Sequence, residues 1–311
     1  MYSVAWSPKG DHIAFVAASY KDDTDIGLLR ASIWVASISQ YGQIEKVARL
    51  ITLTRKQGIP VSLFWLDSNR VGWAASRASS FVFMQISMAN NKPEPLVSQS
   101  FRGFQGTGDS GPWSAPDDVY YDTASRTLLF SAALPPDNEV YVRALSLVTK
   151  KARNLNVPPL KGLAHPVISN VTLCGSLGNP NKPEFYLAAW MLGHTYEDGG
   201  CYLWNSTSYS LRQDKILASS PHRGLAFPRT SPSGRLLAYL QLPGEGKSDE
   251  LILHDLKSSK HRTVVMISSG WEGAQPVFGC PFSWSPDGKM IAYADGSKIR
   301  IVKVKLPTIT K

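Results

Sequence analysis

Acidic and histidine residues are the first candidates for chemistry, because carboxylates and imidazoles bind metal ions and transfer protons. The acidic clusters are Asp22, Asp23 and Asp25 in one loop, Asp117 and Asp118 in another, and Glu197 with Asp198 shortly after His194. No segment has the calcium-loop spacing of an EF-hand. We therefore interpret these clusters as solvated loop charge and expect no catalytic residue, no metal ligand and no cofactor.

One serine lies in a segment with the composition of a protease nucleophile loop. Residues 108–112 read Gly-Asp-Ser-Gly-Pro, which is similar to the segment around the nucleophile of trypsin-like proteases. The second glycine that shapes the oxyanion hole is absent, and no histidine of the chain has the sequence context of the partner base. No Gly-x-Ser-x-Gly elbow occurs either. We interpret residues 108–112 as a glycine-rich loop.

The cysteines and the chain ends restrict the class of protein. Cys174, Cys201 and Cys280 show neither a Cys-x-x-Cys pair nor zinc-ligand spacing, so we expect neither a disulfide framework nor a structural zinc. No run of about 20 apolar residues occurs, so we expect no membrane insertion. Because the first residues lack the pattern of a signal peptide, we expect a cytoplasmic protein unless the N-terminus has been removed.

The charge balance favours acidic partners. The chain has 33 Lys and Arg against 24 Asp and Glu, giving a formal net charge of +9 and a pI near 9.4. The basic residues are scattered, and no aromatic-basic phrase of an RNA-binding module accompanies them. Lys303 and Lys305 have another role available, since lysines on an edge strand prevent aggregation. We expect a protein partner, one that is acidic, a monomeric state and no nucleic-acid binding.

The elements that must position these residues are strands. Apolar residues come in runs of four to eight, rich in Val, Ile, Leu and aromatic residues and separated by Gly, Pro, Asp and Ser clusters. Examples are residues 12–17, 32–38, 81–86, 139–145 and 251–256. We therefore predict a chain that is mostly or entirely β.

A nine-residue phrase recurs along the chain. It reads Ser-Pro-x-Gly-x-x-aliphatic-Ala-aromatic and occupies residues 7–15, 231–239 and 285–293. Proline presets φ at the second turn position and glycine accepts a positive φ two residues later, so the phrase predicts a tight turn followed by a buried strand. Weaker copies at residues 64–73 and 120–130 keep the aromatic residue, the polar turn and the apolar strand.

The spacing of the phrase predicts a β-propeller. Ser231 and Ser285 lie 54 positions apart, and about five such periods separate Ser7 from Ser285, which corresponds to six units. We predict one six-bladed all-β propeller with three to four antiparallel strands per blade. The alternative is a β-sandwich or two separate β domains, but neither would explain why the phrase recurs at one constant spacing. The predicted blades span residues 1–55, 56–105, 106–160, 161–220, 221–268 and 269–311.

The phrase resembles the WD40-like repeat of TolB-type propellers, and the predicted number of units is similar to that of the TolB propeller domain. The resemblance covers the whole chain loosely, and it rests on the three units that carry the full phrase. It implies a scaffold that binds protein partners, although related propellers also gate prolyl-oligopeptidase-like enzymes. After the strand at residues 298–304 there is no room for a full outer strand. The ring therefore closes differently there, or the chain is part of a longer protein.

The expected function is a non-catalytic scaffold that binds a protein through loops on one face. Trp113 and Trp271 lie in Gly/Pro-rich loops and are the candidate partner-binding residues, together with Arg102 and Phe104 in the irregular stretch 98–117. The alternatives are a hydrolase or lyase with His165, His194, His222 or the acidic clusters at the axial channel, or a detached propeller domain of a prolyl-oligopeptidase-like protease.

Overall fold

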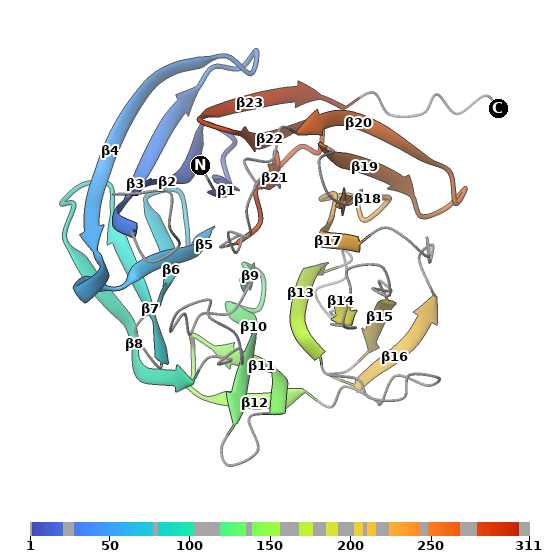
Figure 1. The fold of residues 1–311 in the computed structure, drawn as a ribbon, viewed down its shortest axis with the longest axis horizontal. Helices are drawn as coiled ribbons and strands as arrows, with labels where there is room; N and C mark the ends of the chain where they lie inside the picture. The colour runs from blue at the N-terminus through green and yellow to red at the C-terminus, as the bar shows by residue number, and fades with distance from the viewer. Residues whose placement is uncertain are drawn as a thin grey trace.

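The computed structural model describes most strands and the turns between them. The described residues are 2–20, 28–76, 80–102, 119–134, 139–155, 168–176, 185–191, 202–207, 210–215, 224–242, 248–267 and 279–304. Antiparallel sheets of consecutive strands are arranged around a central axis, in the order of the chain (Figure 1). The fold is therefore an all-β propeller.

Five sheets have four strands each. Their strands are β1 Tyr2–Trp6, β2 His12–Tyr20, β3 Leu28–Ile38 and β4 Ile44–Thr54; β5 Ile59–Trp65, β6 Arg70–Ser76, β7 Ser80–Ser87 and β8 Pro93–Arg102; β9 Val119–Asp122, β10 Thr127–Leu134, β11 Glu139–Ser146 and β12 Ala152–Leu155; β13 Ile168–Ser176, β14 Phe185–Met191, β15 Tyr202–Thr207 and β16 Ser210–Lys215; and β17 Gly224–Thr230, β18 Leu236–Leu242, β19 Asp249–Asp255 and β20 His261–Ile267. The one described helix, η2 Arg55–Gln57, is a single 3₁₀ turn that links β4 to β5.

The last sheet is shorter. It consists of β21 Phe282–Trp284, β22 Met290–Asp295 and β23 Lys298–Lys303. The structure thus has five four-stranded blades where the sequence predicted six blades, and the remaining sheet has three strands. A second expectation needs correction, because residues 98–102 of the stretch expected to be irregular belong to β8, where Phe101 is buried.

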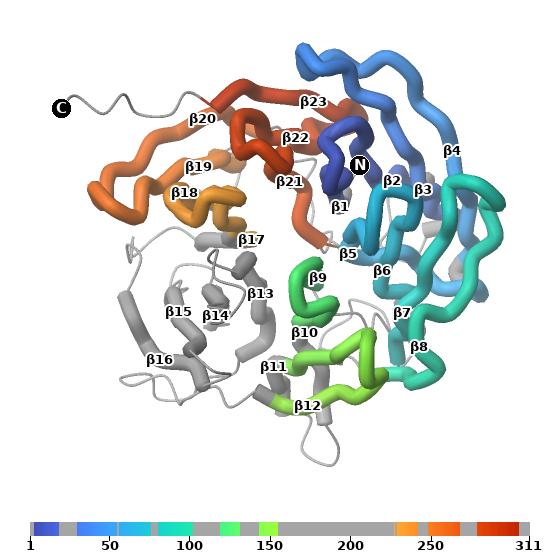
Figure 2. The backbone as a smooth tube through the Cα atoms, turned by 180° about the vertical axis from the view of Figure 1, so that it is seen from behind, coloured from blue at the N-terminus to red at the C-terminus, as the bar shows by residue number. Residues whose placement is uncertain are grey.

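Apolar clusters lie between neighbouring sheets rather than at one centre. One cluster joins the first two sheets through Val16, Ile33 and Trp73, and a second joins β5–β8 to β9–β12 through Phe81 and Phe130. Sheet β21–β23 shares clusters with both of its neighbours, β17–β20 and β1–β4. Figure 2 shows this sheet from behind, between β17–β20 and the N-terminal strands.

The recurring phrase forms the predicted tight turn. The N–H groups of Gly10, Gly234 and Gly288 donate to the carbonyls of Ser7, Ser231 and Ser285 at 2.8–3.0 Å, and all three glycines have positive φ. Each serine Oγ also accepts a hydrogen bond from the N–H five residues later, from His12, Leu236 and Met290. The serine of the phrase therefore ties the turn to the strand that follows it.

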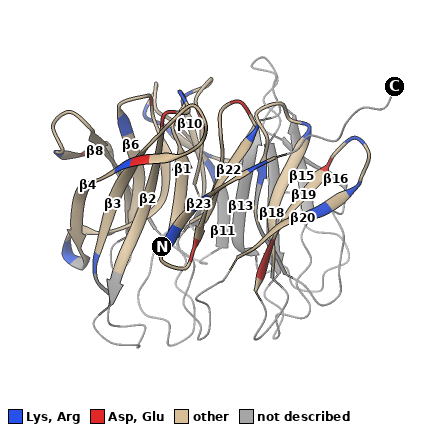
Figure 3. Ribbon diagram, turned by 90° about the horizontal axis from the view of Figure 1, so that it is seen from above, with Lys and Arg blue, Asp and Glu red and all other residues tan. Residues whose placement is uncertain are grey.

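The two ends of the strands form two different faces. Because consecutive strands are antiparallel, the first and third connections of each sheet leave at one face, and the second connection and the link to the next sheet leave at the other. The first face carries short turns, such as residues 7–11, 66–69 and 285–289, and we name it the turn face. Figure 3 shows the ring from its edge, with turns along one side.

Candidate functional site

The turns of neighbouring sheets are locked together by the residues that the repeat shares. The Trp65 indole Nε1 donates to the Ala5 carbonyl of the preceding sheet at 3.0 Å, and Trp284 Nε1 donates in the same way to the Arg229 carbonyl at 3.1 Å. A Cβ on Gly288 would lie 3.4 Å from the Pro232 ring of the preceding sheet, and one on Gly10 would lie 3.6 Å from that of Pro286. These contacts connect turns of neighbouring sheets into one continuous surface at the turn face.

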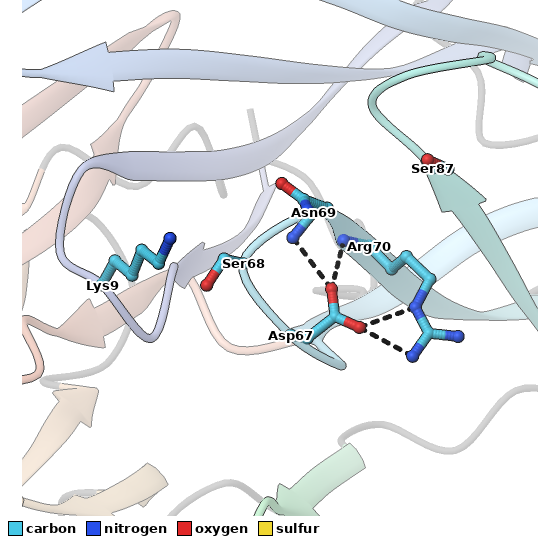
Figure 4. A pocket seen from close by; sticks show the side chains of 6 residues that line it. All are labelled: Lys9, Asp67, Ser68, Asn69, Arg70 and Ser87. Atoms are coloured by element: carbon cyan, nitrogen blue, oxygen red, sulfur yellow. Dashed lines mark hydrogen bonds and ion pairs between the residues drawn. The ribbon is translucent and has the colours of Figure 1, made fainter.

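A hollow on the turn face lies between the first two sheets. Its volume is about 380 Å³, and it is lined by Lys9 from the β1–β2 turn, by Asp67, Ser68, Asn69 and Arg70 at the β5–β6 turn, and by Ser87 at the end of β7 (Figure 4). The hollow is polar and open to solvent. Small-molecule sites are usually apolar and enclosed, so this shape suits a side chain presented by a partner better than a buried ligand.

The charges in the hollow do not cancel. Asp67 accepts hydrogen bonds from the N–H groups of Asn69 and Arg70, and its other oxygen lies 2.7 Å from the Arg70 guanidinium (Figure 4). Partial burial raises the pKa of Asp67, but the Asn69 N–H and the Arg70 contacts outweigh it and hold the pKa below its usual value. Within the described part of the chain Lys9 has no ion pair or hydrogen bond, so its ammonium group is the unbalanced charge.

The other turns repeat this arrangement. Asp255 accepts from the N–H groups of Lys257 and Ser258 and from the Arg235 guanidinium, and Asp287 accepts from Ser285 Oγ and the Lys289 N–H. The turn carboxylates thus accept hydrogen bonds from backbone N–H groups of their own turns and contact nearby cations. The described turns and their flanking positions hold ten basic residues, Lys9, Arg70, Lys92, Arg126, Lys150, Lys151, Arg235, Lys257, Lys260 and Lys289, against five acidic ones, Asp11, Asp67, Asp122, Asp255 and Asp287. Figure 3 shows basic segments along this side.

Near the axis, hydrogen bonds connect the inner strands β1 and β5 with the segment that leads into β21. The Val4 N–H donates to the Cys280 carbonyl at 2.9 Å, and the Leu63 N–H donates to Ser3 Oγ at 2.7 Å. Ser3 and Ser62 are buried with φ near +50°, each at an irregularity in the pairing of its strand. No sequence pattern distinguishes these serines from turn serines, so this network could not be predicted from the residue order.

The residues predicted to bind a partner lie almost entirely outside the described residues. Trp113, Trp271 and Phe104 fall there, and Arg102 is placed only as the last residue of β8, paired with Ser80. Their roles stay predictions. The strands that flank residues 103–118 and 268–278 end at the face opposite the turn face.

The residues that the sequence offered for an enzyme site stay predictions. His165, His194, His222, Ser110 and the acidic clusters at residues 22–25, 117–118 and 197–198 lie outside the described residues. Among the residues that the structure does describe, no group of three or more His, Cys, Asp or Glu side chains could hold a metal ion. The described part of the chain also contains no helix long and apolar enough to cross a membrane.

Comparison with solved structures shows which known folds this chain is similar to. TolB from Acinetobacter baumannii matches with a TM-score of 0.62 and 14% identity, over 94% of this chain and 61% of that one. TolB from Agrobacterium tumefaciens, described as putative, matches with a TM-score of 0.58 and 12% identity, over 97% and 90%. A nidogen/laminin complex matches with a TM-score of 0.55 and 13% identity, over 93% and 89%.

The chain thus spans less than two thirds of the Acinetobacter TolB structure. No family model matches the sequence, and no curated protein matches it either. At these identities the likeness concerns the fold. The turn phrase, the ring of antiparallel sheets and the two TolB structures agree, and the chain has the fold of a TolB-type β-propeller.

Proposed function

We propose that this chain is a non-catalytic β-propeller scaffold that binds an acidic protein partner on its turn face. The observation that carries the proposal is the charge arrangement there: turn carboxylates are occupied by backbone N–H groups and cations, whereas Lys9 and other turn lysines extend into solvent. A rigid basic surface steers acidic proteins and keeps its geometry on binding. One similar structure is a nidogen/laminin complex, which is an assembly of proteins.

We also propose that sheet β21–β23 acts as a sixth, three-stranded blade and closes the ring. Support comes from hydrogen bonds that this part of the chain makes with the sheets on both sides of it. The Trp284 indole bonds to the Arg229 carbonyl of the preceding sheet, and the Val4 N–H of the following sheet bonds to the Cys280 carbonyl. The first of these bonds has its counterpart between the second sheet and the first, where the Trp65 indole bonds to the Ala5 carbonyl.

The opposite face is a second surface for the same class of partner. Strands flanking residues 103–118 and 268–278 end there, and these connections contain Phe104, Trp113 and Trp271. Long connections on a rigid scaffold are frequent binding segments. We propose Arg102, Phe104, Trp113 and Trp271 as its contact residues.

Affinity capture from a native extract tests which face binds. The wild type is compared with a turn-face variant, Lys9→Glu with Lys289→Glu, and with a loop-face variant, Trp113→Ala with Trp271→Ala. We expect the wild type to recover a stoichiometric acidic protein, the turn-face variant to recover at least tenfold less of it, and the loop-face variant to lose only proteins that bind through the opposite face. Undiminished recovery by the turn-face variant, or recovery of nucleic acid alone, would refute the turn-face proposal.

A further inference from the structure

The outer edge of β23 is open in the described part of the molecule. In every other sheet a fourth strand pairs with the third, whereas β23 pairs with β22 alone among the described strands. Figure 1 shows β23 on the rim of the ring, between β4 and β20. An unpaired strand edge is a template for an added strand.

The register identifies the backbone groups at this edge. Asp295 pairs with Lys298 across a two-residue turn, and the Val304 N–H donates to the Lys289 carbonyl at 2.7 Å. Since antiparallel pairs alternate, residues 298, 300, 302 and 304 direct their N–H and carbonyl groups toward β22. Ile299, Ile301 and Lys303 direct theirs toward the open edge.

An apolar surface lies beside this edge, on the β3–β4 hairpin. Its turn reaches β21–β23, because a Cβ on Gly42 would lie 2.6 Å from Met290 Sδ and 3.9 Å from Ile301 Cγ2. Ile44 is 40% exposed and Val47 is 48% exposed. Their cross-strand partners Ile38 and Ala36 belong to the cluster shared with β21–β23, so Ile44 and Val47 face that sheet.

This concentration of apolar residues is local. Five large hydrophobic residues are exposed in the described part of the chain, and three of them, Tyr41, Ile44 and Val47, lie on this hairpin. Single exposed apolar residues are ordinary on a protein surface, whereas several together mark an interaction site.

The charges around the outer edge of β23 indicate which kind of strand would pair with it. Lys298, Arg300 and Lys303 lie on β23, and Arg49 lies on the same face of β4 as Val47, against the acidic Asp295 and Glu45. Arg300 is paired with Asp295 at 2.6 Å, which leaves the lysines in excess. A second copy of β23 would bring another set of lysines and an arginine to the same edge, and like charges brought close together destabilise a strand pair.

We propose that the edge of β23 binds an extended acidic segment of a partner protein as a fourth strand. Backbone pairing with Ile299, Ile301 and Lys303 supplies affinity, and alternate side chains meet Ile44 and Val47 or the lysines. The site is on the rim, so the proposal does not depend on the function proposed for the turn face.

A synthetic peptide with the sequence Glu-Val-Glu-Val-Thr-Val-Glu-Val-Glu tests the proposal by fluorescence anisotropy. Ile301→Pro removes the outward N–H and keeps the pairing with β22, while the matched Ile301→Ala variant keeps that N–H. We expect Ile301→Pro to weaken binding at least tenfold more than Ile301→Ala, and Lys56→Glu, at an exposed position in the β4–β5 link, to leave it unchanged. Equal binding by folded Ile301→Pro and Ile301→Ala, or equal binding of a peptide with Lys in place of Glu, overturns the proposal.

Amide hydrogen exchange in the free protein gives a second test. If the edge is open, the amides of Ile299, Ile301 and Lys303 exchange at least tenfold faster than those of Arg300 and Val302, and the peptide slows them. Slow exchange of all five amides that becomes fast in a chain truncated after Val304 would show that residues 305–311 occupy the edge. That result would refute the proposal.

Discussion

At the scale of single residues, the repeated Ser and Trp positions hold the ring together. Ser7 Oγ accepts the His12 N–H within its own turn, whereas the Trp65 indole reaches the Ala5 carbonyl of the sheet before it. Trp6 occupies the position equivalent to Trp65 and Trp284, yet its buried Nε1 has no hydrogen-bond partner among the described residues. One repeated residue type therefore makes different contributions at different junctions.

This difference predicts unequal effects of one substitution. Trp65→Phe leaves the Ala5 carbonyl without its donor, whereas Trp6→Phe removes an unpaired N–H group. Since the loss of ring volume is the same, we expect Trp65→Phe to lower the free energy of unfolding by about 1 kcal/mol more than Trp6→Phe. Urea denaturation of both variants measures this, and equal losses would show that the indole bond contributes nothing.

Asp255 predicts part of the acid sensitivity of the fold. Burial raises the pKa of Asp255, but the Ser258 N–H, the Arg235 guanidinium and the Lys257 N–H outweigh it, so the pKa lies below the usual 3.8. A lowered pKa stabilises the folded state above the unfolded-state value, and this contribution is lost as the pH falls through the folded-state value.

The test is the difference in unfolding free energy between wild type and Asp255→Asn. It is largest at pH 7 and shrinks below about pH 4, where the wild-type carboxylate becomes protonated. Glu45→Gln, at an exposed position, serves as the control and shows little difference at either pH. A difference for Asp255→Asn that does not change with pH would contradict this assignment.

At the scale of elements, turn and strand types were predictable from local residue order. The Pro-x-Gly pair requires the observed turn, and each turn leads into an apolar strand such as β18 or β22. The bonds from Trp65 and Trp284 to the preceding sheets join residues 60 and 55 positions apart, and no local pattern encodes such pairs. The hollow at Lys9 and Asp67 was missed for the same reason, because two separate turns form it.

The β5–β6 hairpin gives a prediction at this scale. Gly72 pairs with Phe64, and a Cβ on Gly72 would lie 2.6 Å from Phe64 Cζ, so the ring covers the glycine. Alanine in a strand is ordinarily more stable than glycine by about 0.5 to 1 kcal/mol. Here we expect Gly72→Ala to destabilise the fold by about 1 to 3 kcal/mol, because the buried Phe64 ring must move.

A double-mutant cycle with Phe64→Leu isolates this contact. The penalty of Gly72→Ala should shrink in the Phe64→Leu background, since the smaller side chain leaves room for the added methyl group. Thermal or urea denaturation of the four proteins measures the coupling. Additive effects of the two substitutions would mean that the contact is not responsible.

At the scale of the whole molecule, the ring has two faces, the turn face and the face opposite it. The repeat period predicted the propeller and approximately its number of units, because the period is a property of the sequence alone. Among the described strands, β21–β23 has no fourth strand. The net charge was interpreted as dispersed, whereas the fold gathers ten basic residues at the turn face, since turns far apart in sequence meet there.

Lysine footprinting of the complex with the captured partner tests the turn-face proposal most directly. Acetylation rates are compared for free and bound protein at each lysine by mass spectrometry. We expect Lys9, Lys92, Lys257, Lys260 and Lys289 to become at least tenfold less reactive in the complex. Lys56, which is exposed in the β4–β5 link at the opposite face, should keep its reactivity. Protection of Lys56 with unchanged turn lysines would refute binding at the turn face.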